Sequence, residues 1–365
     1  REVRAILAKT DQFLVIAGVQ TPGRYLRAKP GTLREATRLL RPYKATRILL
    51  GPAAVCGTQV RGGAAVEQPA QGAFDELRPF GDQPYEALQP WALAGAEIIR
   101  QIPHPRIVEI ETGRGCTRRP GCSFCTEPIK TASAVWRPAA AVIEEVRRLR
   151  ALGAAHFRLG KQSCIYSYHD GDPQALATLL AGLAALDPAV LHADNTNPAQ
   201  VTPERTELLV KYLTPGSTAA MGVESFDPAV ARQNNLNADF DTTLDAMRII
   251  NRIGGWRGAN GCHALLPGIN LLLGLEGETA ATLEANLAAL RRIRDEGLLF
   301  RRINIRQVVP YPGTPLAQRV GNKILRKHRR LYPAWIERVR QEIEVPMLQT
   351  LYPEGTVLRD LLAEV

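Results

Sequence analysis

The sequence has no long hydrophobic run, few cysteines and no segment of low complexity. No apolar stretch approaches the roughly 18 residues that cross a bilayer, so we expect a soluble protein that does not bind membranes. Six cysteines in 365 residues are too few for a disulfide scaffold, and three of them crowd together, which suits a metal site and a reducing cytoplasm. The apolar content of 45% excludes a disordered chain and is enough for a large core.

Acidic residues are also in deficit, with 36 against 46 basic residues, which gives a net charge of +10. Much of the excess lies between residues 319 and 340, where one acid, Glu337, stands among Arg319, Lys323, Arg326, Lys327, Arg329, Arg330, Arg338 and Arg340. We expect a basic helical extension over residues 319–365, with one helix at Val320–Arg340. Its charge suits an acidic protein surface and, less well, nucleic acid; a solvated helix face is the simpler alternative.

Between residues 101 and 318, β-rich apolar runs alternate with helical patterns. Strands are predicted at Ile107–Glu111, His156–Leu159, Val190–Ala193, Thr218–Val223, Leu265–Leu273 and Ile303–Val309. Helices are predicted at Pro138–Leu152, Pro173–Leu186, Pro203–Leu213, Phe240–Ile253 and Thr279–Glu296, with a shorter turn at Pro228–Gln233. This alternation indicates an α/β fold with parallel strands, and six βα units fit a partial (β/α)6 barrel. An open doubly wound sheet is the alternative.

Residues 1–100 have a different pattern, which resembles a Rossmann-like domain with a linker. Phe13–Ala17 and Thr46–Leu50 are predicted strands, and Thr32–Leu40 is a predicted helix with Thr32 as its N-cap. Gly57–Pro90 is rich in Gly, Pro and Gln and is expected to be a loop. With two visible βα units and Arg1 as the first residue, we expect this domain to be incomplete.

Three cysteines lie in a glycine-rich loop directly after the first predicted barrel strand. Cys116, Cys122 and Cys125 can hold three corners of an iron–sulfur cubane and leave its fourth iron open. A structural zinc site is the alternative, but zinc needs a fourth ligand. The next His or Cys along the chain is His156, followed by Cys164, so the spacing favours the cluster.

The Cys-x5-Cys-x-Phe-Cys motif at this position resembles the radical SAM superfamily. Members of that superfamily bind a [4Fe–4S] cluster with three cysteines and chelate S-adenosylmethionine (SAM) at the fourth iron. The usual spacing between the first two cysteines is three residues, whereas this chain has five. Three later segments are similar to family elements: Gly222-Val-Glu-Ser225, Gly274-Leu-Glu-Gly-Glu-Thr279 and Val309-Pro-Tyr-Pro-Gly-Thr-Pro315. The resemblance covers about residues 107–316.

The resemblance implies which residues contact SAM and what the enzyme needs. The expected SAM contacts are Phe124, Thr126, Glu127, Gln162, Asn195, Asn197 and Glu224. The amides among them suit the ribose or the amino-acid part of SAM, and loop capping is their alternative role. The family's radical chemistry also implies an electron donor such as a ferredoxin or flavodoxin.

Residues 13–23 and 48–53 resemble the later half of the cobalamin-binding domain found upstream of many radical SAM methyltransferases. This implies cobalamin contacts at Thr21, Pro22, Gly23 and Gly51. No His precedes His104, so the motif whose His can ligate cobalt from below is absent.

The whole chain resembles archaeal cobalamin/radical SAM proteins, which implies a C-methyltransferase acting on an sp3 carbon. The implied substrate is a protein or peptide, with a glutamine of methyl-coenzyme M reductase as one candidate. One alternative is a methylthiotransferase acting on tRNA or protein; such enzymes hold a second cluster with three N-terminal cysteines, whereas this region has only Cys56. The other alternative is a non-catalytic basic binding module with a structural metal.

Overall fold

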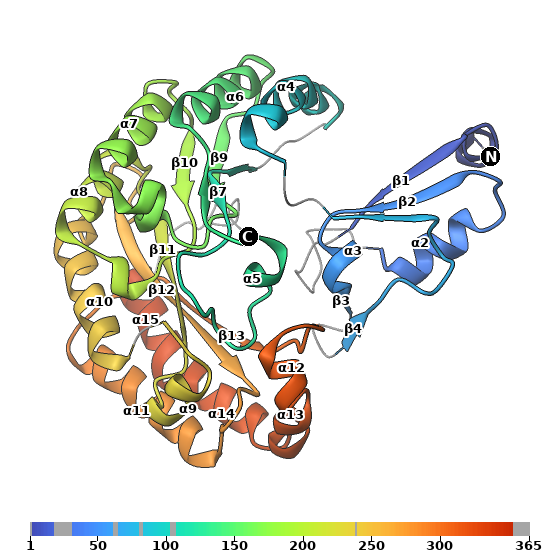
Figure 1. Ribbon diagram of the computed structural model, residues 1–365. Coiled ribbons are helices and arrows are strands. Elements are labelled where there is room, and N and C mark those ends of the chain that lie inside the picture. The colour runs from blue at the N-terminus through green and yellow to red at the C-terminus, as the bar shows by residue number, and fades with distance from the viewer. Residues whose placement is uncertain are drawn as a thin grey trace.

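The computed structural model describes residues 2–17, 31–60, 65–79, 83–102, 107–237 and 239–352. These residues form a large curved α/β region and a smaller N-terminal α/β region beside it (Figure 1). No helix in the described ranges is long and apolar enough to cross a membrane.

Six parallel strands line the inside of the curved region. They are β6 (Val108–Glu111), β9 (His156–Gly160), β10 (Val190–Ala193), β11 (Ser217–Glu224), β12 (Leu265–Leu273) and β13 (Arg302–Gln307), as predicted to within a few residues. They pair in the orders β10–β9–β6 and β11–β12–β13, and a parallel bridge between Thr196 and Met221 joins the two sheets. Among the described strands no pairing joins β6 to β13, so the barrel is open on one side (Figure 1).

Helices cover the convex side of these strands (Figure 1). They are α6 (Ala139–Ala151), α7 (Pro173–Ala184), α8 (Pro203–Tyr212), α10 (Phe240–Gly254) and α11 (Ala280–Asp295), with the short α9 (Pro228–Gln233) after β11. Along β9, Phe157 and Leu159 are buried in the core that the strands share with the helices. Because side chains alternate along a strand, Arg158 between them points to the inner side. The inner wall is therefore free to carry polar groups.

The N-terminal region holds a three-stranded parallel sheet in the order β1–β2–β5. Its elements are α1 (Glu2–Ala8), β1 (Gln12–Ile16), α2 (Leu33–Leu40), β2 (Thr46–Leu50), α3 (Ala53–Cys56), β3 (Thr58–Val60), β4 (Ala65–Glu67) and β5 (Glu76–Arg78). Thr32 caps α2 in a capping box with Glu35, as expected.

The prediction that Gly57–Pro90 is a loop is wrong. This segment contains the β3–β4 hairpin, the third sheet strand β5 and the start of α4 (Tyr85–Gly95), which leads to a 3-10 turn at Ala96–Gln101. Its strands are three residues long, too short for the side-chain alternation that reveals a strand.

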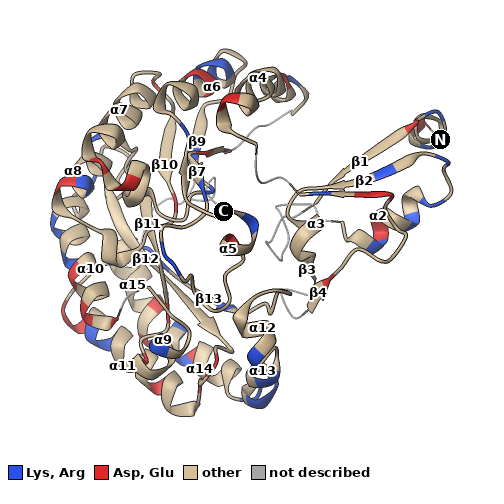
Figure 2. Cartoon of the chain, in the orientation of Figure 1, with Lys and Arg blue, Asp and Glu red and all other residues tan. Residues whose placement is uncertain are grey.

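The single helix predicted at Val320–Arg340 is also wrong. The chain forms α12 (Pro315–Arg319), α13 (Lys323–His328), α14 (Tyr332–Val339), a π turn at Arg340–Glu344 and α15 (Val345–Leu351). Gly321 has a positive φ of 53° between α12 and α13, and Pro333, which has no N–H to donate, lies in the first turn of α14. Lys and Arg gather on α13 (Figure 2), whereas Arg338 pairs with Glu284 over 2.5 Å.

Candidate active site

The loop with the three cysteines begins where β6 ends. Its base is closed by β7 (Gly113–Arg114), which pairs antiparallel with β8 (Val135–Trp136), and the short α5 (Glu127–Lys130) follows the last cysteine. Gly115 has a φ of 77°, and a Cβ there would collide with the carbonyl oxygen of Ser133. Only glycine fits this turn without strain.

The cysteine loop is held in place by residues from much later in the chain. The Ser123 hydroxyl donates to the Asn234 side-chain oxygen over 2.7 Å, and the Ser123 N–H donates to the Asn234 carbonyl over 2.9 Å. The Asn235 amide donates to the Pro120 carbonyl over 2.6 Å. From the other side, the Leu316 N–H donates to the Ser123 carbonyl over 2.9 Å. These contacts fix the loop against the segment after α9 and against α12.

The three thiols lie in a partly buried group with hydrogen-bond donors around it. The Arg118 guanidinium donates to the Cys122 Sγ over 3.0 Å and its backbone N–H to the Cys116 Sγ over 3.4 Å. The Glu127 N–H donates to the Cys125 Sγ over 3.5 Å. Burial raises the pKa of Cys122 and raises that of Cys125 to about 12, and the neighbouring thiols add to both. A bound cation would favour the ionised forms of Cys122 and Cys125.

The donor set fits an iron–sulfur cluster better than zinc. In the described part of the chain, no three His, Cys, Asp or Glu side chains are close enough to hold one metal ion. A cubane binds each thiolate at a different iron, so its three cysteines can lie farther apart than the ligands of a single metal ion. Cys164, a possible fourth zinc ligand, is buried in the core and accepts a hydrogen bond from the Asn197 N–H over 3.2 Å.

The polar residues predicted to contact SAM after β9 and β10 lie side by side and bind loop backbone. The buried Gln162 amide donates to the Asp194 carbonyl over 2.8 Å, and the Asn195 amide donates to the Gln162 carbonyl over 2.8 Å. Asn197 caps the short turn Pro198–Gln200. These contacts correspond to the loop-capping role, and the SAM contacts stay a prediction.

Glu224 ends β11 in a strained backbone conformation facing the cysteine loop. Its φ is 67°, in the left-handed region that non-glycine residues rarely adopt, next to a shift in the β11–β12 register. Burial raises its pKa to about 8, although the nearby Arg306 lowers it. Its negative charge in turn raises the pKa of Cys122. Strain combined with a shifted pKa is typical of a functional residue.

Three residues predicted to contact SAM lie on or directly after the cysteine loop, and each has a different environment. Phe124 packs beside an apolar cluster that includes Val308 and Leu316. Thr126 is buried. Burial raises the pKa of Glu127, but Lys130, paired with it at 2.9 Å, together with the Lys161 charge and the Gly115 N–H, outweighs this effect, so the pKa is lowered. Their contacts with SAM remain predictions.

The motifs Gly274–Thr279 and Val309–Pro315 follow β12 and β13 and make hydrogen bonds that hold the ends of these strands. Glu278 accepts hydrogen bonds from the Gly274 N–H over 3.0 Å and from the Tyr332 hydroxyl over 2.5 Å. Tyr332 belongs to no motif, so nothing in the sequence indicated it. In the Val309–Pro315 segment, the Thr314 hydroxyl donates to the Tyr311 carbonyl over 2.7 Å.

The N-terminal region approaches the cysteine loop at the end of α3. The pKa of Cys56 is raised by burial, and the charges of Lys130 and Glu127 on α5 also affect it. Gly51, predicted to contact cobalamin, directly follows β2 and has a φ of 93°. The other predicted cobalamin contacts, Thr21, Pro22 and Gly23, lie outside the described residues.

Comparison with known proteins gives three findings. The family profile described as the radical SAM superfamily matches residues 110–285. An uncharacterised protein of Methanocaldococcus jannaschii is 39% identical over 411 aligned positions, which cover 100% of this chain and 76% of the relative. The ribosomal protein uS12 methylthiotransferase of Salinispora tropica is 30% identical over 206 positions, covering 55% of this chain and 38% of that enzyme.

Among solved structures, the chain is similar to TsrM from Kitasatospora setae, a radical S-adenosylmethionine methyltransferase crystallised with tryptophan substrate and a SAM analogue. The TM-score is 0.56 at 15% identity, and the match covers 86% of this chain and 66% of that one. This match shows a shared fold. The chain thus spans about two thirds of TsrM and under two fifths of the methylthiotransferase.

Proposed function

Because this chain belongs to the radical SAM superfamily, we propose that it uses a SAM-derived radical, together with cobalamin, to methylate an sp3 carbon. Membership makes the protein a radical SAM enzyme and implies a [4Fe–4S] cluster and SAM. It therefore argues against the non-catalytic binding module. The observation that carries the radical SAM part of this proposal is the group of three cysteines after β6, which would leave one iron of a bound cubane open.

In this family the cluster and SAM, when bound, supply a 5′-deoxyadenosyl radical that abstracts hydrogen from an unactivated carbon. The chain's own residues hold and tune these groups. Cys116, Cys122 and Cys125 provide the thiolates, and Arg118 donates hydrogen bonds to two of them. Glu224, with its pKa near neutrality, can accept or hold a proton beside a bound amino group.

The proposal of cobalamin and methylation draws on the N-terminal region. Its parallel β1–β2–β5 sheet suits a Rossmann-like domain, and the match to TsrM extends over 86% of the chain, more than the barrel alone. The end of α3 lies near α5 of the cysteine loop. A cofactor at the carboxyl end of the N-terminal sheet would thus face the SAM site. With no His before His104, cobalt would have no histidine ligand from this part of the chain.

The charge of α13 and the open side of the barrel support proposals for the electron donor and the substrate. The basic residues of α13 suit an acidic ferredoxin or flavodoxin as the electron donor (Figure 2). The open side of the barrel suits a protein or peptide substrate, of which a glutamine of methyl-coenzyme M reductase is one candidate. A nucleic acid is a weaker alternative, and the cytoplasm is the compartment in which such a cluster would persist.

A methylthiotransferase acting on tRNA or protein is the second candidate function. It is favoured by the relatives of known activity, which include the ribosomal protein uS12 enzyme and tRNA-2-methylthio-N(6)-dimethylallyladenosine synthase of Halorhodospira halophila. The first matches 55% of this chain and the second 68%. Within residues 1–100 the sequence has one cysteine, Cys56, which is fewer than the three that a second cluster needs.

The test is a cofactor assay on anaerobically purified and reconstituted protein. Iron, cobalt and the visible spectrum are measured first, and SAM and a reductant are then added to detect 5′-deoxyadenosine. Cys125→Ala is expected to abolish SAM cleavage. Cys262→Ala, which removes a thiol between α10 and β12 and outside the cysteine loop, is the matched control and is expected to retain it.

The outcomes separate the candidates. About four irons, bound cobalamin and 5′-deoxyadenosine formation support the proposal. About eight irons without cobalamin favour the methylthiotransferase. Zinc without SAM cleavage contradicts both.

A further inference from the structure

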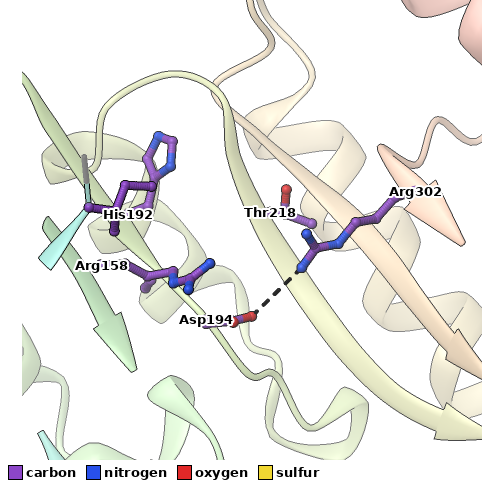
Figure 3. Close-up of a pocket in the computed structure, with 7 residues that line it drawn as sticks. Arg158, His192, Asp194, Thr218 and Arg302 are labelled. Carbon is purple, nitrogen blue, oxygen red and sulfur yellow. Dashed lines mark ion pairs between the residues drawn. The ribbon is translucent and has the colours of Figure 1, made fainter. Parts of the chain in front are cut away.

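The inner wall of the barrel carries a group of charged side chains below the cysteine loop. Arg158 on β9, His192 on β10 and Arg302 at the start of β13 line one pocket, together with Asp194 and Thr218. Arg158 and Arg302 point toward Asp194 from opposite sides (Figure 3). We call this pair of arginines the inner-wall pair. Arg158 is on β9 and Arg302 on β13, with β10, β11 and β12 between them in the arc, so the fold brings the two arginines together.

The inner-wall pair has few partners for its hydrogen-bond donors. Arg302 lies 4.0 Å from the Asp194 carboxylate, and Arg158 lies 3.5 Å from Glu109. The Nε atoms of both arginines are buried and have no hydrogen-bond partner among the described residues. On the outer surface, by contrast, Arg338 binds the two oxygens of Glu284 over 2.5 and 3.0 Å. A guanidinium has five N–H donors, so each member of the inner-wall pair can bind a further oxygen through donors that the described residues do not satisfy.

Several positively charged arginines lie near one another around Arg302. Burial lowers the pKa of Arg302, and Arg158, Arg301 and Arg306 lower it further, against the opposing effect of Asp194. The carboxylates of Asp194 and Glu109 offset only part of this positive charge, so the site favours a further anion. The forked guanidinium matches the planar edge of a carboxylate or two oxygens of a phosphate.

We propose that Arg158 and Arg302 bind an oxyanion group of the substrate, a carboxylate or a phosphate, at the base of the barrel. The identification of this ligand as the substrate rests on the proposed function, whereas the oxyanion site itself does not. The pocket is a small, half-open hollow of about 30 Å³, which suits a terminal oxyanion group.

The position of the site also restricts the shape of the substrate. Thr218 of the pocket and Glu224 at the cysteine loop lie on the same strand, β11, six residues apart. At roughly 3.3 Å per residue they are about 20 Å apart along the strand. A substrate with its oxyanion at the inner-wall pair and its reacting carbon near the cysteine loop must therefore be elongated.

The test measures oxyanion binding to the full chain without SAM. Sodium acetate and inorganic phosphate are titrated separately in a calorimeter at constant ionic strength, because part of each arginine is exposed and screened by salt. The wild type is expected to bind one of them saturably. The double variant Arg158→Gln/Arg302→Gln is expected to bind about tenfold more weakly or not at all. Arg248→Gln, which removes an exposed arginine paired with Glu296 on the outer surface, is the matched control and is expected to bind like the wild type.

A second readout separates binding from a structural role. Because the inner-wall pair is poorly satisfied, the double variant is expected to melt at the wild-type temperature or above it. If it fails to fold, Arg302→Lys replaces it, since lysine keeps the charge and loses the fork; it is expected to fold and to bind the oxyanion more weakly.

Saturation by acetate alone indicates a carboxylate-bearing substrate, and saturation by phosphate indicates a phosphorylated one; both support the proposal. Absence of saturable binding by the wild type, or equal binding by wild type and double variant, overturns it. If the protein binds an oxyanion but forms no 5′-deoxyadenosine, the proposed function fails and the site stands. If it forms 5′-deoxyadenosine but binds no oxyanion, only this inference fails.

Discussion

Replacing Arg118 by glutamine is expected to lower the reduction potential of the cluster. Its guanidinium donates to the Cys122 Sγ over 3.0 Å. A cationic donor beside a cluster thiolate stabilises the more negative, reduced state more than the oxidised state, so it raises the potential. A hydrogen bond involving a charged group contributes about 1.5–3 kcal/mol. If about 1.4 kcal/mol of this differs between the two states, the variant should shift by about 59 mV for a one-electron couple.

The measurement is a potentiometric titration of the reconstituted protein followed by electron paramagnetic resonance. Arg119→Gln is the matched control, because among the described residues this neighbouring guanidinium donates only to backbone carbonyls, those of Arg118, Thr131 and Ala132. The control is expected to keep the wild-type potential. Equal shifts in both variants, or an unchanged potential in Arg118→Gln, would refute the reasoning, because charge near the loop or loop distortion would then account for the result.

Three other predictions follow from single residues. Burial raises the pKa of Glu224 to about 8, so the folded state loses stability as pH rises from the ordinary carboxyl pKa through 8. In urea, Glu224→Gln should be about 2 kcal/mol more stable than the wild type at pH 8.5 and equally stable at pH 4. Tyr332→Phe removes a donor to the buried Glu278 and should cost about 2 kcal/mol of unfolding free energy; an unchanged urea midpoint would contradict this. Gly115→Ala should reduce iron content after reconstitution, whereas Gly72→Ala, at a similar φ of 70° with open space around it, should not.

The barrel could be predicted because its signals are local. Strands such as Leu265–Leu273 are long apolar runs, and helices such as Pro203–Tyr212 begin with a proline behind a capping threonine. The cysteine motif likewise lies within ten consecutive residues, so its spacing could be read directly. Two kinds of feature were not predicted. One was very short strands, such as Glu76–Arg78; the other was the interruption between helices at Gly321, where the sequence reads as one continuous helix.

What surrounds the site could not be predicted, because it depends on contacts between distant segments. Ser123 and Asn234 are 111 residues apart, and Glu278 and Tyr332 are 54 apart. The inner-wall pair is another example. The sequence places Arg158 and Arg302 in strands, but only the curvature of the sheet brings the two side chains to one pocket. Sequence patterns indicate which face of a strand a residue occupies, and tertiary structure decides what it meets there.

The hydrogen bonds that clamp the cysteine loop have a consequence for synthesis of the protein. The partner of Ser123 follows it by 111 residues, which at about 5–20 residues per second takes roughly 6–22 s to be translated. During that interval the nascent chain carries three unclamped thiols that oxygen or a stray metal ion can capture. The last of these contacts, from Leu316, forms later still. We therefore expect expression strains to yield more correctly loaded protein when oxygen is kept low throughout translation and not only during purification.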